Sequence, residues 1–530
     1  MIREENTDTR SSVGLLTLVL VLTLIGAALR LYNLSGQGFG LDEMYTLRYA
    51  TGLEAQVGEE YEGEVIDAQR FRDWLASHRS LQPMTMIEET YKSEPSHPPL
   101  YYLLANLSLA AFGVSEFALR FPSALFGALT IPFMFLLGRR LHSSEAGVLG
   151  AAIFTFAPFQ IYYGQSARMY SMLCFLAVVS IWLVVELSFR REEGRDWAAW
   201  RLWAGWAGVT AVGSYLHYYY VFALAIEFLF VVVRHFRDRI FLKRWFVVLG
   251  LGLLPFLPWL ALRIFHHTLE GVAWLNGNSG AGSLISAAGD GLLGFVWTDE
   301  QRPYKAVWFW TVLLVIGILS VKRQKGLWLL PIWMVLPPAV VVTLDLLLGT
   351  QASTVPRYYI VASPALYLLM ACGILTIRPP ALSKVVAGAG LVYLAVGGYL
   401  TAEGTIRTKA EFKQVGLEIA RTSNPDDAVI VFSAVPTDSV MLLSYYMDRQ
   451  KRFGRFLVQN AGEINLDQAM KQIGTGDHVT LVLSYVQKPQ AFDPGSVTRR
   501  IPDLKFAEMR KYRPYLNVYK FERTSDASVR

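Results

Sequence analysis

The stretch Ser11–Leu29, SSVGLLTLVLVLTLIGAAL, contains no charged residue and decides the class of fold. A helix needs about 20 mostly apolar residues to cross the hydrocarbon core of a bilayer, and this run meets that need. Similar runs recur up to Leu400, after which the composition becomes that of an ordinary soluble domain. The sequence therefore predicts a polytopic α-helical membrane protein with a soluble tail.

Composition excludes two other classes of protein. The 530 residues are 53% hydrophobic and 17% charged, against about 25% charged residues in an average soluble protein, so a soluble enzyme is excluded. The net charge of +6 does not indicate a nucleic-acid partner, because the basic residues lie in short loops and not on one arm or face. Cys174 and Cys372 both lie in apolar runs, which indicates neither a disulfide framework nor a thiolate metal site.

Charge in the loops predicts the topology. The apolar runs give about eleven spans, at 14–31, 121–138, 145–163, 169–189, 202–216, 218–233, 245–262, 304–320, 327–344, 358–377 and 383–401. With the N-terminus in the cytoplasm and the first span retained, each strongly basic loop falls inside, as the positive-inside rule requires. The short apolar segment Pro99–Phe112 is then a helix at the outer surface. The predicted location is the plasma or inner membrane, with an extracytoplasmic tail.

This topology places a large first loop, residues 32–120, on the outer side. Between Asp42 and Glu94 the loop has twelve acidic and five basic residues, and loops of this length are usually functional or disordered. We therefore expect a transmembrane catalytic domain over 1–403, which includes this loop, and a second domain over 404–530.

The tail has the pattern of a small α/β domain. Helical spacing is expected over 410–421, 439–447 and 466–473, and buried strands over 428–432 and 478–483. Strands that alternate with helices favour a parallel sheet. The tail has no glycine loop of the phosphate-binding type, so we interpret it as an accessory or substrate-docking domain.

The acidic pair Asp42-Glu43 follows the first span within Gly-Phe-Gly-Leu-Asp-Glu-Met-Tyr. A carboxylate just above a membrane can act as a general base, while the alternative is an ordinary solvated pair in an acidic loop. His97 stands in Ser-His-Pro-Pro-Leu-Tyr-Tyr, where two prolines fix the backbone at the start of a helix. This histidine either binds a phosphate or sugar hydroxyl or is simply exposed at a helix entry.

Two arginines lie at predicted outer ends of spans. Arg168 is in Tyr-Tyr-Gly-Gln-Ser-Ala-Arg-Met-Tyr, and Arg357 is in Val-Pro-Arg-Tyr-Tyr. Two cations are what a bound phosphate or diphosphate needs, although an interfacial arginine can also reach lipid headgroups. Neighbouring aromatic residues such as Tyr163 and Tyr218 are expected in the interfacial belt in any case. No cofactor is expected; a divalent metal held by Asp42, Glu43, His97 and His217 is an alternative by ligand type, but no spacing motif supports it.

These motifs together resemble the family 39 membrane glycosyltransferases, which have the GT-C fold and are related to protein O-mannosyltransferases and to the aminoarabinose transferase of lipid A. The resemblance rests on the outward Asp-Glu, His-Pro-Pro-Leu-Tyr-Tyr, Glu116-Phe-Ala-Leu-Arg-Phe-Pro-Ser, and Tyr-Gly-Gln-Ser-Ala-Arg-Met-Tyr-Ser. It is dense over residues 14–190 and weak in the tail. His97 replaces the lysine of the lipid A branch, which places the chain nearer the mannosyltransferases at this position.

The resemblance implies an inverting sugar transfer at the outer face, from a polyprenyl-phosphate-linked donor to the hydroxyl of a lipid, glycan or protein acceptor. It assigns Asp42 to activation of the acceptor, with Glu43 beside it. The residues expected at the donor phosphate are Arg168, Arg357, His97, Tyr358 and Tyr163, and further candidates for substrate binding are His217, Tyr218 and Gln165. The competing class is a transporter or flippase of lipid-linked sugars, which would need ionisable residues deep in the spans and an internal repeat.

Overall fold

The computed structural model describes residues 2–52, 65–67, 83–93, 97–195, 199–266, 275–277, 279–296, 304–320, 326–404, 411–422, 427–433, 436–448, 455–460, 478–484, 493–500, 503–512 and 516–524. These residues form two compact units. The membrane unit comprises Met1–Tyr32, Glu94–Tyr101 and Arg120–Arg407, and the second unit comprises Asn33–Ser93, Tyr102–Leu119 and Thr408–Arg530. The second unit thus joins part of the first loop to the tail, which differs from the expected division at 403/404.

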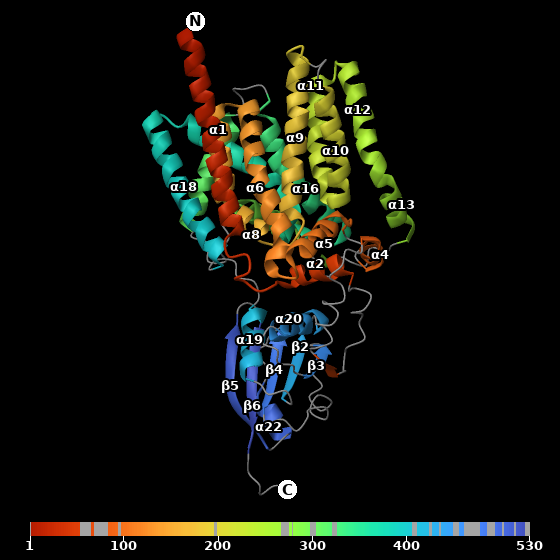
Figure 1. Cartoon of the computed structure of the whole chain (residues 1–530). Coiled ribbons are helices and arrows are strands. Elements are labelled where there is room, and N and C mark those ends of the chain that lie inside the picture. Colours follow the sequence, from red (N-terminus) through yellow and green to blue (C-terminus); the bar gives the residue numbers. More distant parts are fainter. Residues whose placement is uncertain are drawn as a thin grey trace. The chain divides into compact units, whose positions relative to one another are not determined.

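The membrane unit is a bundle of helices (Figure 1). Its elements are α1 (Ile2–Leu31), α6 (Glu116–Leu141), α7 (Ser144–Phe156), α8 (Pro158–Gly164), α9 (Tyr170–Glu192), α10 (Trp200–Leu216), η3 (Tyr218–Tyr220), α11 (Val221–His235), α12 (Arg239–Leu253), η4 (Leu254–Phe256), α13 (Leu257–His266), α14 (Ala281–Leu293), α15 (Tyr304–Ser320), α16 (Leu329–Leu348), η7 (Ala352–Thr354), η8 (Pro356–Ala362), α17 (Ser363–Thr376) and α18 (Pro380–Glu403). Only the start of α6 belongs to the second unit.

Each of the eleven predicted spans coincides with one helix or with two or three consecutive helices. Within the described residues, 8 helices are long and apolar enough to cross a membrane, or up to 9 if the bent pair α7–α8 is one span. The difference from eleven comes from short helices, because α10 and α15 have 17 residues each. The chain is a multi-pass membrane protein, and the predicted number of spans stays a prediction.

Small residues let the helices of the bundle approach closely. A methyl group added to Gly317 of α15 would lie 2.0 Å from the carbonyl oxygen of Leu369 in α17, and one added to Gly373 would lie 2.1 Å from that of Leu313. Glycine at both contact points permits the backbones of α15 and α17 to touch, as is common between membrane helices. Helix α17 is accordingly almost wholly buried.

Arg30 fills the break between α7 and α8, which are bent by 59°. Pro158 starts α8 and has no N–H to continue the ladder of α7, so carbonyls at the end of α7 are left without helical donors. The guanidinium of Arg30 donates to the carbonyls of Phe154 and Thr155, each at 3.3 Å, and to that of Gly26 at 3.0 Å. Its charge also suits the negative end of the α7 dipole. This fully buried arginine therefore replaces the missing donors.

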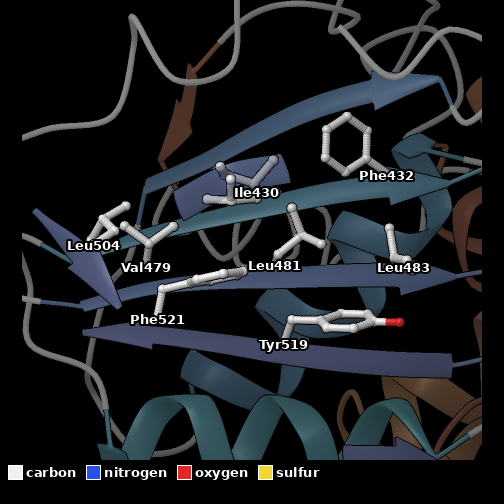
Figure 2. Close-up of a cluster of buried hydrophobic side chains, with 9 residues drawn as sticks. Ile430, Phe432, Val479, Leu481, Leu483, Leu504, Tyr519 and Phe521 are labelled. Atoms are coloured by element: carbon white, nitrogen blue, oxygen red, sulfur yellow. The ribbon is translucent and has the colours of Figure 1, made fainter. Parts of the chain in front are cut away.

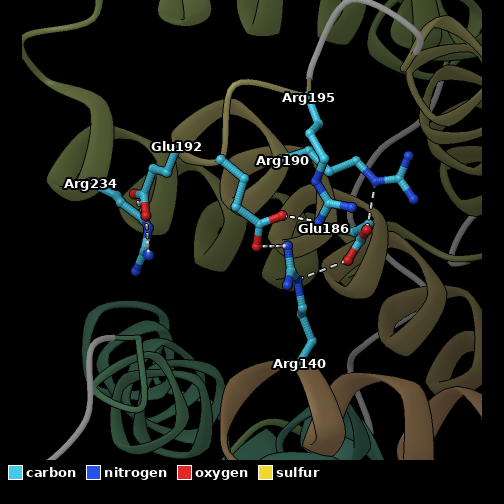
Figure 3. Close-up of polar contacts among 7 residues, drawn as sticks. Arg140, Glu186, Arg190, Glu192, Arg195 and Arg234 are labelled. Carbon is cyan, nitrogen blue, oxygen red and sulfur yellow. Dashed lines mark hydrogen bonds and ion pairs between the residues drawn. The ribbon is translucent and has the colours of Figure 1, made fainter. Parts of the chain in front are cut away.

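Ion pairs join α6, α9 and α11 at one end of the bundle (Figure 3). Glu186 of α9 accepts from Arg140 at 2.9 Å and from Arg190 at 2.6 Å, while Arg140 also pairs with Glu193. Arg234 of α11 pairs with Glu192 at 2.6 Å, and a further pair joins Arg191 to Asp238. Basic residues at three of the predicted inner loops thus meet at a common end.

The second unit is built around a sheet in the tail. Its elements are α2 (Leu41–Thr51), β1 (Val65–Asp67), α4 (Pro83–Ser93), α5 (Leu100–Phe112), α19 (Phe412–Thr422), β2 (Ala428–Ser433), α20 (Pro436–Asp448), β3 (Arg455–Asn460), β4 (His478–Ser484), α22 (Gly495–Arg500), β5 (Leu504–Tyr512) and β6 (Leu516–Arg523). The six strands lie in the order β1-β3-β2-β4-β6-β5. The predicted helix at 466–473 lies outside the described residues.

The expected parallel sheet is mixed. Strand β2 pairs parallel with β3 and β4, as the alternation of helices and strands predicts. Strands β5 and β6 add an antiparallel hairpin next to β4, and β1 of the first loop pairs antiparallel with β3. The prediction was wrong about these edges because the alternating pattern reports only the crossover connections at the centre of the sheet.

One face of the sheet carries a compact apolar cluster (Figure 2). Side chains two residues apart on a strand share a face, so Ile430 and Phe432 lie on the same side of β2. They pack with buried side chains from the neighbouring strands and from α22, namely Val479, Leu481, Leu483, Val497, Leu504, Tyr519 and Phe521. The cluster fixes the register of the central strands.

Candidate active site

Arg168 lies in the link between α8 and α9, and hydrogen bonds fix the backbone of this link. The N–H of Arg168 donates to the carbonyl of Ser166 at 2.7 Å. The carbonyl of Arg168 accepts from the hydroxyl of Ser123 in α6 at 2.9 Å, and Ser123 Oγ is itself 2.6 Å from the Tyr101 hydroxyl. Arg168 is 8% exposed, so a long cationic side chain is held in a largely buried position.

His217 lies between α10 and η3 and is 3% exposed. Its Nδ1 accepts from the N–H of Tyr219 at 3.0 Å, which places the proton of the neutral ring on Nε2. Nε2 is buried and has no hydrogen-bond partner among the described residues. Burial lowers the pKa of His217, and the charges of His97 and Arg168 lower it further. The ring is therefore a neutral donor with an unused N–H.

Aromatic rings connect His217 to the other candidate residues. The ring centroid of His97 lies 5.1 Å from that of His217 in an edge-on arrangement, and the rings of Tyr170 and Tyr219 lie 5.8 Å and 4.8 Å from His217. Tyr219 in turn contacts Tyr358 at 5.4 Å. These residues come from four separate parts of the chain and form one group.

Arg357 of η8 belongs to the same group. Its guanidinium lies over the ring of Tyr358 at 5.5 Å and over that of Tyr170 at 5.9 Å. Tyr170 also contacts Tyr163 of α8, at 5.6 Å. The predicted phosphate residues Arg357, Tyr358, His97 and Tyr163 are thereby brought together with His217, and Arg168 is an electrostatic neighbour of that histidine.

Asp345, which the sequence analysis did not select, supports the segment before Arg357. Its carboxylate, at the end of α16, accepts from the N–H groups of Ala352 and Ser353 at 2.8 and 2.7 Å and from the Thr350 hydroxyl at 2.5 Å. A single acidic residue inside the apolar run 329–348 was the signal available in the sequence. Tyr170 and Tyr219 were also missed, since interfacial tyrosines are common and nothing in their spacing distinguishes these two.

Two of the candidate substrate-binding residues are engaged within the chain. The amide of Gln165 donates to the carbonyls of Leu29 and Tyr32 at 3.1 and 2.7 Å, where it supports the end of α1. The hydroxyl of Tyr218 accepts from Trp259 at 3.2 Å. These contacts give both side chains a structural role in the bundle.

The acidic pair lies in the second unit, in the first turn of α2. Glu43 is 2% exposed, and its Oε2 accepts from the N–H of Gly40 at 2.9 Å, which caps the N–H of the residue that precedes the helix. Asp42 is only partly buried. The structure therefore distinguishes the two carboxylates: Glu43 stabilises the helix start, while Asp42 is the more accessible of the pair.

Within the described residues, no group of three or more His, Cys, Asp or Glu side chains is arranged to hold a metal ion. His97 and His217 are neighbours, but the carboxylates named with them belong to the other unit.

Comparison with known proteins agrees with this architecture. Residues 96–262 match the family model described as dolichyl-phosphate-mannose-protein mannosyltransferase. The fold is similar to that of ArnT from Cupriavidus metallidurans in the apo state, with a TM-score of 0.57, 13% identity, and coverage of 96% of this chain and 98% of that one. The same protein bound to undecaprenyl phosphate matches with a TM-score of 0.54, 15% identity, and coverage of 97% and 98%. No curated protein matches by sequence.

The fold and the matched segment together define a class of protein. The chain is a membrane glycosyltransferase with the GT-C fold. The matched segment contains His97, Arg168 and His217, so three of the candidate site residues lie in the part of the chain that carries the family pattern.

Proposed function

We propose that the chain transfers a sugar, with inversion, from a polyprenyl-phosphate-linked donor to an acceptor hydroxyl at the outer face of the membrane. The observation that carries the proposal is the group of His97, Arg168, His217 and Arg357, which combines arginines with a buried N–H donor. Such a group suits a phosphate ester, because charge-assisted hydrogen bonds are strongest to ionised oxygens.

In the proposed reaction, one residue acts on the acceptor hydroxyl and a second group of residues acts on the departing phosphate. The Asp42 carboxylate takes the proton of the acceptor hydroxyl, whose oxygen attacks the anomeric carbon. The bond from that carbon to the phosphate oxygen breaks, and its electrons leave with the polyprenyl phosphate. Arg357, Arg168 and the Nε2–H of His217 stabilise the charge that develops on the phosphate. No glycosyl-enzyme intermediate is needed, so a single base suffices.

The proposed orientation follows from the ion-pair end of the bundle. Arg140, Arg190 and Arg234 meet there, and basic residues are enriched on the cytoplasmic side of membrane proteins. With that end in the cytoplasm, the N-terminus is cytoplasmic and the transfer reaction takes place at the outer face. The solved structure of ArnT bound to undecaprenyl phosphate supports a lipid carrier of the same class for this chain.

The test is turnover by the purified full chain with labelled undecaprenyl-phosphate mannose and, in parallel, an undecaprenyl-phosphate pentose. Release of undecaprenyl phosphate in the presence of a cell-envelope extract as the source of acceptor is the readout. The substitution Asp42→Asn should reduce release by about 10²–10⁴-fold, which is what a general base contributes in rate, while the protein stays folded and still binds undecaprenyl phosphate. Normal turnover by Asp42→Asn would contradict the base assignment.

A further inference from the structure

The segment that leads into α2 is held by side chains of the tail, within the second unit. The backbone N–H of Phe39 donates to the hydroxyl of Tyr446 in α20 at 2.6 Å. The Phe39 side chain is 0% exposed, and its ring lies 5.1 Å from that of Tyr445. A residue three positions before Asp42 is therefore fixed by both its backbone and its side chain.

Lys413 of α19 contacts the same segment at residues 35 and 36. Its ammonium donates to the carbonyls of Ser35 and Gly36, and it pairs at 3.4 Å with Glu116, which is 0% exposed. A buried carboxylate helps to keep this lysine in place, because separation would remove a positive charge from beside Glu116 in a site of low solvation. Lys413 thus connects the first loop, the start of α6 and the tail.

Gly38 lies where the segment before α2 closely approaches α19 and α20. A methyl group at this position would lie 2.7 Å from Cβ of Lys413 and 3.2 Å from the Tyr446 hydroxyl. Only glycine allows this contact without displacement of α19 or of the segment. The close approach is therefore part of how residues 35–39 reach α2.

The segment 35–39 runs directly into the start of α2, where the acidic pair lies. Gly40 follows Phe39 and donates its N–H to Glu43, so the hydrogen bond that caps α2 begins one residue after the Tyr446 contact. At the other end of α2, Asn106 of α5 donates to the carbonyl of Ala50 at 2.7 Å, and Tyr102 packs against Tyr49. Both ends of an 11-residue helix are fixed, and Asp42 is in its first turn.

We infer that Tyr446 and Lys413 are positioning residues for the Asp42 carboxylate, and that the tail serves the transfer reaction through them. This inference rests on the proposed role of Asp42 as the base. A general base acts only when it lies within hydrogen-bond reach of the proton that it removes, and a shift of about 1 Å can cost about 100-fold in rate. The tail then supports the proposed base through α2 and is not only a docking domain.

The test compares Tyr446→Phe with Tyr445→Phe in the purified full chain. Tyr446→Phe removes the acceptor of the Phe39 N–H, whereas Tyr445→Phe removes a neighbouring hydroxyl and keeps the ring that packs on Phe39. With undecaprenyl-phosphate mannose as probe, Tyr446→Phe should lower kcat about tenfold and leave the KM for the donor within twofold, and Tyr445→Phe should match the wild type. A kcat for Tyr446→Phe equal to that of the wild type would overturn the inference.

Hydrogen exchange gives a readout that needs no substrate. Amide exchange in a peptide over 36–46 should be faster in Tyr446→Phe, while exchange in a peptide over 428–433 stays unchanged. Unchanged exchange in 36–46 would overturn the inference even if activity fell. If Asp42→Asn retains turnover, the assignment of Asp42 as the base fails, and the exchange result still reports separately on the contact.

Lys413 supplies a second pair of variants in case Tyr446→Phe does not fold. Lys413→Met removes the charge that pairs with Glu116, and Lys413→Arg keeps it. The loss of kcat expected in Lys413→Met should be recovered at least in part by Lys413→Arg, with the donor KM constant in both. Equal kcat in the two variants would contradict a positioning role for Lys413.

Discussion

In the membrane unit, His217 adds a hydrogen-bond donor to the group that contains Arg168 and Arg357. His217 uses Nδ1 within the chain and keeps Nε2 buried and without a partner among the described residues. A buried donor with no acceptor costs about 1–3 kcal/mol. That cost is recovered when an acceptor such as a phosphate oxygen arrives, so the arrangement favours the bound state.

Replacement of His217 should therefore weaken donor binding. His217→Phe keeps a ring among Tyr170, Tyr219 and His97 but removes the Nε2–H. We expect the affinity of the purified chain for undecaprenyl phosphate to fall about tenfold, which is the loss of one hydrogen bond to a charged group. Isothermal titration measures it, with Tyr218→Phe as the control. Equal affinity in His217→Phe and the wild type would remove Nε2 from the site.

At the scale of elements, a broken helix positions the link that carries Arg168. The bend between α7 and α8 is stabilised by Arg30, whose stem also passes close to two glycines: a methyl group on Gly164 would lie 3.0 Å from its Cγ, and one on Gly127 2.9 Å from its Nε. Helices α1, α6, α7 and α8 thus meet at one side chain. The link Gln165–Met169 begins directly after α8.

Removal of Arg30 should loosen this junction. Arg30→Leu keeps an apolar stem but leaves the carbonyls of Phe154 and Thr155 without donors, and each buried unsatisfied group costs about 1–3 kcal/mol. We expect the thermal unfolding midpoint of the detergent-solubilised protein to fall by several degrees. Arg139→Leu, at an exposed arginine of α6, is the matched control. A midpoint unchanged by Arg30→Leu would show that water or lipid replaces the guanidinium.

Glu418 makes the sheet of the tail sensitive to acid. Its carboxylate, on α19, accepts from Lys520 of β6 at 2.6 Å and from the hydroxyl of Tyr512 of β5. Burial alone would raise the pKa of Glu418, but these hydrogen bonds outweigh it, and the pKa lies below its usual value. A lowered pKa adds stability that is complete above the usual glutamate range and is lost as the pH falls through the folded value.

The expected result is a loss of protection in β5 and β6 below about pH 4.5, near the usual glutamate pKa. Hydrogen exchange of peptides over 504–523 in the full chain, corrected for the intrinsic rate at each pH, measures this loss. Glu418→Gln should show weaker protection at pH 7 and a smaller change on acidification. A pH dependence as large in Glu418→Gln as in the wild type would assign the effect to another group.

At the scale of the whole molecule, the sequence predicts what depends on long runs and misses what depends on pairing between distant segments. The apolar runs gave a helix at each predicted span, because transfer into a bilayer is a property of the run itself. Strand β1 has three residues, and β3, β5 and β6 show no pattern as clear as that of β2. Their places in the sheet depend on partners far away in the chain, as in the pairing of Val65 with Leu457.

The candidate site follows the same rule. Arg168, His217 and Arg357 were predicted from their positions at span ends, because an ionisable residue there is costly without a role. Asp345, Tyr446 and Lys413 were not, since their importance comes only from the contacts that they make with Ser353, Phe39 and Glu116. The substitutions Asp42→Asn and His217→Phe test the roles proposed for two of the predicted site residues.

The pairing of β1 with β3 has a consequence for biosynthesis. Val65–Asp67 emerge from the ribosome early, but their partner Arg455–Asn460 is made about 390 residues later, after all the apolar runs. At about 5–20 residues per second, the early strand waits on the order of 20–80 seconds for its neighbour. During this interval Val65–Asp67 have no partner strand, and an unpaired strand edge is prone to aggregation until the sheet is completed. In a chain truncated before β3, β1 would never gain this partner strand.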